Sequence, residues 1–338
     1  MMPKRTAMPT RIFFIFVVFL VTAAMVGATG QGEVSLSEEA AEPLDVSVEV
    51  LKGPTGMGMI RLMGEEPSFG DSVNVDYAVS GAPDVLVSKV LSGEVDIAAL
   101  PSNVAAKLYN SGVPYQLAAV NTLGVLYLVS TGPEVDSFSE LAGARIDTSA
   151  RGANPDIILR HLLSEHGVDP ESDVELRYYN HTELAQLVIA GRSDLAVLPE
   201  PFVTRVVNAS DTARVEIDLQ EVWRDLKGED AFIAMGVLVV KDSLVAERPA
   251  FVRSFLEQYE ASVDWVNENP RAAGRLIEEN ELGFTAASAA EAIPRANIRY
   301  IGAGEARQRL EEYFSVLRDF DPASIGGALP DDAFYLDL

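Results

Sequence analysis

The chain contains a short glycine-rich loop whose residue types are suited to binding a small ligand. The loop runs from Gly53 to Gly58 and lies between a predicted strand and a short helical run. At such a turn helix N–H groups point at a ligand, glycine lets the backbone approach it, and Thr55 adds a hydroxyl. The spacing is that of neither a P-loop nor a dinucleotide-binding turn, so it does not indicate nucleotide binding. Thr55, Gly56 and Gly58 are candidate ligand-binding residues, and a plain tight turn is the alternative.

A ten-residue pattern that occurs twice predicts two further binding loops. Ser92–Pro101 and Ala190–Pro199 agree at five of ten positions, and the two copies start 98 residues apart. Each copy joins the end of an amphipathic helix to a short apolar strand that stops at a proline. The repeat predicts two similar α/β lobes, with the loops after the strands on opposite walls of one cleft. Chance agreement between common loop residues is the alternative.

The residues after the two copies can contact a ligand from both walls. Ser102 and Asn103 follow the first copy, and each can cap the next helix or face the ligand. Glu200 lies between two prolines after the second copy, where its carboxylate can accept hydrogen bonds from a ring N–H or an amine. Phe202 offers an aromatic face for stacking. A solvent-exposed carboxylate is the alternative for Glu200.

A third candidate loop combines hydroxyls, a cation and the start of a helix. It runs from Thr148 to Pro155 and includes Arg151 and Asn154, a combination suited to an anionic group. An ion pair with one of the chain's many carboxylates is the alternative for Arg151. Asn121, in a predicted hinge, is a weaker candidate, and His181 is more typical of a surface residue than of a ligand contact.

Motifs for catalysis, metals and cofactors are absent from the sequence. The three histidines, His161, His166 and His181, do not have metal-binding spacing, and there is no G-x-S-x-G motif. The chain has no cysteine, which excludes disulfides, Cys-ligated zinc and thiol nucleophiles. We therefore expect no catalytic residue, no metal and no cofactor.

The composition is typical of an acidic globular protein. The 338 residues include 26 Lys and Arg against 51 Asp and Glu, a formal net charge of −25, which makes nucleic acid an unsuitable partner. A hydrophobic content of 48 % is typical of folded chains, and the length suits one large or two medium domains. The acidic surface should oppose self-association, so we expect a monomer.

The N-terminus has the pattern of an export signal. Lys4, Arg5 and Arg11 precede the apolar run Ile12–Val26, and small residues follow it. We interpret residues 1–28 as a signal peptide cleaved after Ala28, which predicts a periplasmic or other extracytoplasmic location. An uncleaved membrane anchor is the alternative. Residues 29–44 are predicted to form a flexible tether, because Gln31–Pro43 has no regular spacing of apolar residues.

The rest of the chain alternates strands with helices, which predicts an α/β fold with two similar, mostly parallel sheets and flanking helices. Two long apolar segments, at residues 115–130 and 232–241, bracket a middle series of strands and helices and predict two hinge strands. After residue 241 the pattern is helical, and these helices are expected to cover the first lobe. The predicted domains are a first lobe of residues 45–122 and 240–338 and a second lobe of residues 123–239.

Six blocks of the sequence carry a resemblance to a known family. The chain resembles extracytoplasmic solute-binding proteins of ATP-driven (ABC) importers, in the branch grouped with nitrate, sulfonate, taurine and thiamine-pyrimidine-precursor binders. The resemblance implies a two-lobe type II periplasmic binding fold that closes around a ligand in its cleft and delivers it to a membrane permease. It leaves the ligand undefined. The blocks are Leu51–Met63, Ser92–Tyr109, Ala118–Val129, Leu198–Thr204, Met235–Ser243 and Ile325–Tyr335.

The sequence thus predicts a receptor for a small polar organic solute rather than an enzyme. A secreted enzyme on the same fold and a sensory receptor are the alternatives. The candidate residues combine one cation (Arg151), one carboxylate (Glu200), neutral polar groups and one aromatic ring. This mixture favours a pyrimidine-like or flavin-like vitamin precursor, with a sulfonate next and nitrate less favoured.

Overall fold

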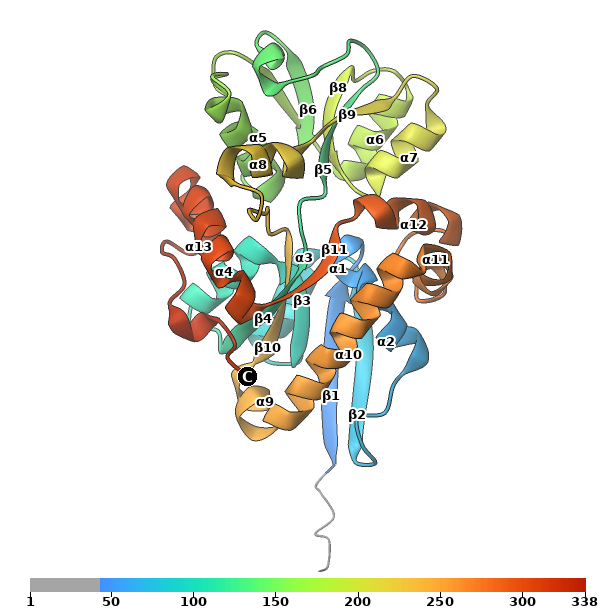
Figure 1. Ribbon diagram of the computed structural model, residues 1–338, viewed down its shortest axis with the longest axis vertical. Helices are drawn as coiled ribbons and strands as arrows, with labels where there is room; N and C mark the ends of the chain where they lie inside the picture. The colour runs from blue at the N-terminus through green and yellow to red at the C-terminus, as the bar shows by residue number, and fades with distance from the viewer. Residues whose placement is uncertain (1–42) are drawn as a thin grey trace, which may run out of the picture. The chain divides into compact units, whose positions relative to one another are not determined.

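Two β-sheets organise residues 43–338, the part of the chain that the computed structural model describes (Figure 1). The expected signal peptide and the expected tether up to residue 42 lie outside these described residues. Within residues 43–338 no helix combines the length and the apolar character needed to cross a membrane. We call the part around each sheet the first and the second lobe.

The first lobe is built on a six-stranded sheet that begins with alternating valines. Val46, Val48 and Val50 occupy alternate positions of the strand before the glycine-rich loop and are each 1 % exposed, so this face of the predicted strand lies in the core. The strand order is β11-β4-β10-β3-β1-β2. The strands are β1 (Leu44–Leu51), β2 (Val73–Ser80), β3 (Ile97–Pro101), β4 (Tyr115–Thr122), β10 (Gly236–Lys241) and β11 (Ile298–Gly302).

The second lobe is built on a five-stranded sheet formed by the middle of the chain. Its strand order is β7-β6-β8-β5-β9. The strands are β5 (Leu126–Ser130), β6 (Arg145–Ser149), β7 (Glu175–Tyr179), β8 (Leu195–Pro199) and β9 (Arg214–Asp218).

Both sheets are mixed rather than mostly parallel, and the reason lies in how the chain crosses between them. The chain leaves the first sheet after β4 and enters the second as β5, which runs antiparallel to β8 and β9. It returns as β10, antiparallel to β3 and β4. The strands that arrive from the other lobe therefore run against their neighbours, whereas β1–β3 and β6–β8 keep the parallel pairing typical of βαβ units.

The repeated sequence pattern forms equivalent units in the two sheets. The helix before each copy ends at a glycine with positive φ, 75° at Gly93 and 63° at Gly191, a conformation that favours glycine. The strand of the first copy is β3 in the first sheet, and that of the second copy is β8 in the second sheet. Because the copies lie in different sheets, the repeat correctly predicted two α/β units.

Helices flank both sheets. In the first lobe they are α1 (Pro54–Met57), α2 (Ile60–Glu65), α3 (Pro83–Ser92), α4 (Ser102–Asn110), α9 (Asp242–Glu247), α10 (Pro249–Glu268), α11 (Pro270–Glu279), α12 (Ala286–Ala292) and α13 (Ala303–Phe320). In the second lobe they are α5 (Asn154–Glu165), α6 (His181–Ile189), α7 (Phe202–Ala209) and α8 (Leu219–Lys227). Short 3₁₀ turns are η1 (Phe138–Leu141), η2 (Ile293–Arg295), η3 (Pro322–Ile325) and η4 (Asp332–Phe334).

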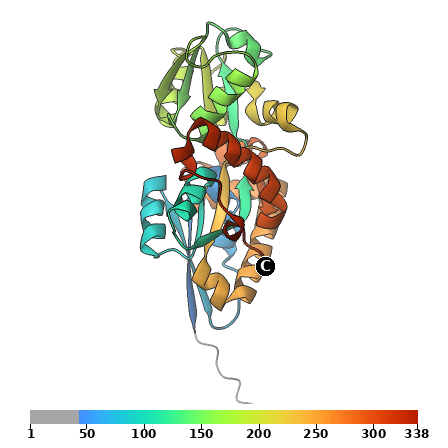
Figure 2. The same cartoon turned by 90° about the vertical axis from the view of Figure 1, so that its left-hand side faces the viewer.

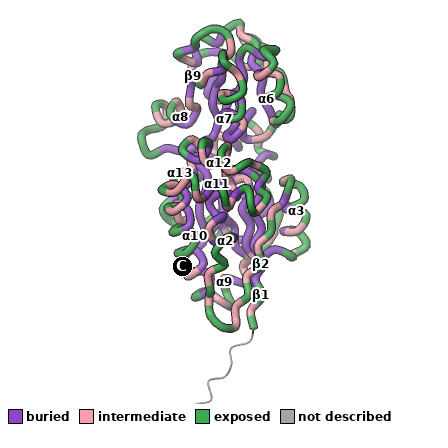
Figure 3. The backbone as a smooth tube through the Cα atoms, turned by 90° about the vertical axis from the view of Figure 1, so that its right-hand side faces the viewer, coloured by how far each residue is buried: buried purple, intermediate pink, exposed green. Residues whose placement is uncertain are grey.

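The C-terminal helices cover the first sheet, as the sequence predicted. Figure 3 shows buried residues concentrated along the strands and on the inward sides of these helices. Helix α13 packs against β4 and extends toward the second lobe (Figure 2). There Tyr313 lies edge-on to Trp223 with ring centroids 5.9 Å apart, and the guanidinium of Arg160 lies 6.0 Å from the ring centroid of Phe320. Helix α13 is therefore one of the elements that join the lobes.

Candidate ligand-binding site

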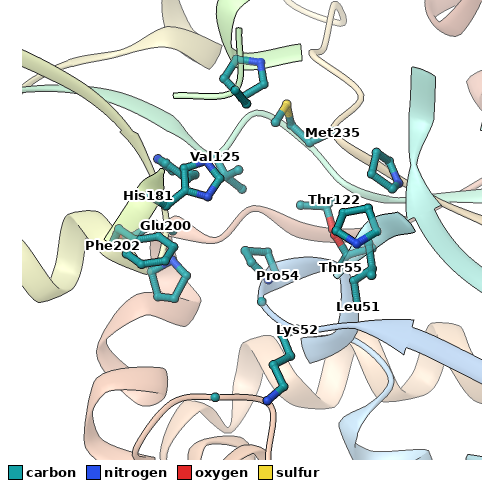
Figure 4. Close-up of a pocket in the computed structure, with 18 of the residues that line it drawn as sticks. Leu51, Lys52, Pro54, Thr55, Thr122, Val125, His181, Glu200, Phe202 and Met235 are labelled. Atoms are coloured by element: carbon teal, nitrogen blue, oxygen red, sulfur yellow. The ribbon is translucent and has the colours of Figure 1, made fainter. Parts of the chain in front are cut away.

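A cavity of about 860 Å³ lies between the two lobes (Figure 4). Figure 4 shows His181, Glu200 and Phe202 of the second lobe on one side, and Leu51, Thr55 and Thr122 of the first lobe on the other. Apolar side chains make up much of the lining, among them Leu51, Pro54, Pro83, Val104, Val125, Pro155, Met235, Leu282 and Phe284. The cavity therefore has the size and character of a site for an organic molecule.

The starts of many helices surround this cavity. Helices α1, α3, α4, α5, α6 and α7 each follow a strand and contribute residues of their first turn to the lining. Thr285, the N-cap of α12, lines it as well. Since the N-terminus of a helix carries partial positive charge and free N–H groups, this arrangement favours an anionic or acceptor-rich ligand.

Two cations add positive charge to the cavity lining. Lys52 comes from the end of the first strand and Arg205 from α7, so each lobe supplies one. Both side chains are exposed, and within residues 43–338 neither forms a side-chain hydrogen bond or an ion pair. They are therefore free to pair with an acidic group of a ligand.

Glu200 lines the same cavity, but protein donors already occupy its carboxylate. Arg295 donates from Nε to Oε1 over 2.6 Å. Thr204 donates from Oγ1 to Oε1 over 3.0 Å and from its backbone N–H to Oε2 over 3.1 Å. Burial raises the pKa of Glu200, and these hydrogen bonds offset part of the rise. Arg295 thus occupies the place that we expected a ring N–H or amine of the ligand to take.

An aromatic pair forms one wall of the cavity. The rings of His181 and Phe202 lie 5.4 Å apart between centroids and are inclined by 39°. Burial lowers the pKa of His181, which keeps its imidazole neutral at pH 7. His181, considered a weak candidate from the sequence, therefore lies beside Phe202 and extends the apolar surface against which a ligand ring can stack.

Five of the ten candidate residues line the cavity, and each comes from a loop singled out in the sequence. Whether they contact a ligand stays a prediction. They are Thr55, Asn103, Asn154, Glu200 and Phe202.

Two candidate glycines lie outside the cavity lining because their role is close packing. A Cβ on Gly56 would lie 2.3 Å from the carbonyl oxygen of Leu51, so only glycine fits against the end of that strand. A Cβ on Gly58 would lie 3.1 Å from both the Tyr259 hydroxyl and a Val263 methyl of α10. The turn is therefore glycine-rich because it packs against strand and helix, a requirement that spacing alone does not distinguish from ligand approach.

Ser102 and Asn121 also lie outside the lining and instead hold neighbouring backbone in place. Ser102 is 0 % exposed and donates from Oγ to the carbonyl of Ala234 over 2.5 Å. Asn121 is 1 % exposed and donates from Nδ2 to the carbonyl of Thr55 over 3.2 Å, which fixes that cavity-lining loop.

Arg151 is exposed and does not line the cavity. Its guanidinium lies 5.2 Å from the ring centroid of Tyr178, a cation–π contact on the second lobe. The cations that do line the cavity are Lys52 and Arg205, neither of which is a candidate from the sequence, and the role of Arg151 toward an anion stays a prediction. Lys52 and Arg205 both adjoin loops that were singled out from the sequence, and extending those loops by a few residues would have found them.

The loop between α11 and α12 contributes lining residues that sequence reasoning missed. Leu282, Gly283, Phe284 and Thr285 reach the cavity from the C-terminal helices. No local motif marks this loop, because its place at the cavity depends on how α11 and α12 pack on the first lobe. Within residues 43–338 no group of three or more His, Asp and Glu side chains is arranged to hold a metal ion.

Comparisons with known proteins place this geometry in a family. Residues 71–273, more than half of the chain, match the family model described as NMT1/THI5 like. A search of curated proteins finds no match.

Solved structures share the fold. A crystal structure of an ABC transporter from Parabacteroides distasonis has a TM-score of 0.73 and 27 % identity, covering 86 % of this chain and 98 % of that one. The periplasmic aliphatic sulphonate binding protein SsuA from Escherichia coli has a TM-score of 0.62 and 13 % identity, covering 81 % and 88 %. The periplasmic nitrate-binding protein NrtA from Synechocystis PCC 6803 has a TM-score of 0.55 and 13 % identity, covering 73 % and 69 %. The family model and the fold confirm the resemblance seen in the sequence: this chain belongs to the NMT1/THI5-like family and has the type II periplasmic-binding-protein fold.

Proposed function

We propose that this protein is the solute-binding component of an ABC importer and holds a small organic solute in the cavity between its lobes. The observation that carries the proposal is the cavity itself, which both lobes line and which helix N-termini surround. The similarity to the Parabacteroides distasonis ABC transporter structure supports the same role. In this role the protein makes and breaks no covalent bond.

The mechanism we propose is closure of the two lobes around the ligand. The lobes predicted as residues 45–122 with 240–338 and residues 123–239 would move as two bodies about the segments that cross between the sheets. All of β10 (Gly236–Lys241) would move with the first lobe, because it is a strand of the first sheet. A ligand that contacts both walls binds the closed form more tightly than the open form and so shifts the equilibrium toward closure. The closed form would then dock on a membrane permease.

The location we propose is outside the cytoplasm. A signal peptide over residues 1–28, cleaved after Ala28, would export the chain, and residues 29–44, the predicted tether, would lead to the folded part, whose first strand begins at Leu44. The excess of acidic residues supports a monomer that repels its own copies and nucleic acid.

The ligand we propose has a ring and an acidic or acceptor-rich group. The wall formed by His181 and Phe202 suits the ring, and Lys52, Arg205 and the helix N-termini suit the acidic group. A cavity of about 860 Å³ with a largely apolar lining is poorly matched to nitrate, which is small and polar all round. A pyrimidine-like or flavin-like vitamin precursor fits these features best, and a sulfonate with an apolar body is the second choice.

A thermal-shift screen tests the proposal. The chain from residue 29 onward is mixed with pyrimidines, flavins, sulfonates, nitrate and amino acids. A ligand that binds only the folded protein adds about 2.7 kcal/mol of stability at 100 times its Kd, which a melting curve resolves. Stabilisation by at least one ring-containing or acidic solute is expected, and a flat response to every class would contradict the proposal.

A further inference from the structure

Arg295 connects the two lobes at one side of the cavity. It ends η2, which follows α12 and leads into β11 of the first sheet. Its guanidinium donates from Nε to Oε1 of Glu200 and from Nη2 to Oγ1 of Thr204, both over 2.6 Å. Glu200 and Thr204 belong to the second lobe, so one side chain of the first lobe binds two residues of the second.

Arg295, Glu200 and Thr204 form a closed hydrogen-bond network rather than a single ion pair. Thr204 Oγ1 accepts from Arg295 and donates to Glu200 Oε1, while the Thr204 backbone N–H donates to Oε2. The Glu200 side chain is 0 % exposed, and that of Arg295 is 39 % exposed. The planar guanidinium fits two acceptors at once, which a lysine ammonium on a flexible stem reproduces less well.

Neighbouring residues of the same segment make further contacts across the lobes. We call residues 285–297 the clasp. The hydroxyl of Tyr127 in β5 donates to the carbonyl of Arg295 over 2.8 Å. Asn208 of α7 is hydrogen-bonded to Glu291 of α12. The clasp also lines the cavity through Thr285 and Ser288, so it adjoins the ligand site and holds the second lobe at the same time.

We propose that Arg295 is a positioning residue that holds the cleft closed through Glu200 and Thr204 without touching the ligand. This inference rests on the proposed function, because holding the cleft closed has a role only if the cleft captures a ligand. Opening the cleft at the clasp separates Arg295 from both acceptors, so the network favours the closed form. The fraction of ligand-free protein in the closed form then sets the apparent affinity for the ligand. If that fraction falls tenfold, the apparent affinity of the protein also falls tenfold.

The network also satisfies the Glu200 carboxylate within the protein, so we do not expect Glu200 to be the main acceptor for a ligand. With the Glu200 carboxylate bound by Arg295 and Thr204, the start of α7, which carries Phe202 and Arg205, is fixed relative to the first lobe. Arg295 thereby positions the aromatic wall and one of the two cavity cations. Loss of the network should therefore loosen the cleft even in the absence of any ligand.

The test measures the distance between the lobes in the ligand-free protein. Because the chain has no cysteine, Ser88→Cys in α3 and Gln186→Cys in α6 provide one spin-labelling site in each lobe, and both positions are exposed and outside the cavity lining. Double electron–electron resonance then gives the distance distribution for the labelled parent and for Arg295→Gln. The expected result is a shift of Arg295→Gln toward longer distances.

Further variants separate positioning from a general loss of structure. Glu200→Gln should shift the distribution in the same direction, and the double variant should add little to either single change. Arg295→Lys, which keeps the charge, should restore part of the closed population. Thr204→Val removes the hydroxyl that accepts from Arg295, with little change in side-chain volume. It provides the test if the variants that change a charge do not fold. Arg299→Gln is the control, since Arg299 is exposed on β11 and, among residues 43–338, its side chain hydrogen-bonds only the adjacent carbonyl of Ile298.

The outcomes distinguish this inference from the proposed function. An unchanged distance distribution in both Arg295→Gln and Thr204→Val would overturn the clasp, even if a solute binds in the thermal-shift screen. A shift in these variants, with Arg299→Gln unchanged, would support the clasp even if every screened solute fails to bind. In that second case only the proposed function would be refuted.

Discussion

Asn154 of the second lobe donates a hydrogen bond from Nδ2 to Oγ of Ser102 in the first lobe over 3.4 Å. Both residues begin helices, α5 and α4, and Ser102 in turn donates to the carbonyl of Ala234 in the segment that returns to the first sheet. The contact therefore joins both lobes and one crossing segment. It adds to the polar contacts that the clasp makes between the lobes.

The first prediction concerns the hydroxyl of Ser102 and its hydrogen bond to the carbonyl of Ala234. Ser102→Ala removes the hydroxyl and leaves the buried carbonyl of Ala234 without that donor, which should lower the free energy of unfolding by about 1–3 kcal/mol. Urea unfolding followed by circular dichroism measures it. Ser88→Ala, on the exposed face of α3, is the control and should change stability by less than about 0.5 kcal/mol. Equal stability of the Ser102→Ala variant and the parent would show that the contact has no energetic weight.

The second prediction concerns the glycine-rich turn. Gly56→Ala places a Cβ 2.3 Å from the carbonyl oxygen of Leu51, so the backbone must shift and stability should fall by about 1–3 kcal/mol. Gly304→Ala is the matched control, because a Cβ there meets nothing within 4 Å and alanine favours the helix. Urea unfolding of the two variants compares them directly. A Gly56→Ala variant as stable as Gly304→Ala would contradict the packing role.

Local sequence patterns predicted the elements and the loops at their ends, because a strand, a turn and a cap depend on neighbouring residues. The valines of β1 and the glycines at residues 93 and 191 are examples. The direction of pairing for β5 and β10 was not visible, since it depends on the route of the chain between the lobes. For the same reason the sequence predicted mostly parallel sheets.

The direction in which a side chain points, and its partners far away in the sequence, could not be predicted from local patterns either. Nothing local shows that Ser102 points to Ala234 while Asn103 lines the cavity. Arg295 lies 95 residues from Glu200 and follows no motif, so the partner that neutralises this carboxylate could not be predicted. Glu200 was expected on a rigid loop between two prolines, either accepting from a ligand N–H or facing solvent; the structure buries it against Arg295, and a contact with a ligand stays a prediction.

The third prediction concerns pH. Burial lowers the pKa of His181 from the ordinary value of 6.5, so the unfolded chain takes up a proton at a higher pH than the folded chain does. Stability should therefore be unaffected above about pH 6.5 and fall as the pH drops from there to the folded-state pKa. The free energy of unfolding at several pH values between 5 and 8 measures this loss.

Variants separate the contributions of the two half-buried histidines, His161 and His181, in that experiment. His161 has a pKa lowered for the same first reason, burial, and contributes a loss of the same sign. His181→Gln should remove part of the fall in the free energy of unfolding at low pH, and His161→Gln should remove another part. If the pH profile of His181→Gln matches that of the parent, His181 is not held neutral by burial.

The fourth prediction concerns the two cavity cations. Lys52→Met and Arg205→Met should each weaken binding of an acidic solute by about two- to fivefold, the range expected for exposed charge pairs. The loss should shrink at high salt because exposed charges are screened. Calorimetric titration at low and high salt measures both effects, with Lys107→Met, which lies outside the cavity lining, as the control. Equal affinity of all three variants would show that the cations do not contact the ligand.

Calorimetric titration of the parent and Phe202→Ala with the best solute from the screen tests the central claim most directly. The claim is that the cavity between the lobes binds an organic solute against the wall formed by His181 and Phe202. The account predicts one solute per chain and a Phe202→Ala affinity lower by about tenfold, because truncating the ring removes its stacking and buried area. Leu91→Ala, exposed on α3 and outside the cavity lining, should bind like the parent. Unchanged affinity in Phe202→Ala, with the protein folded, would contradict the account.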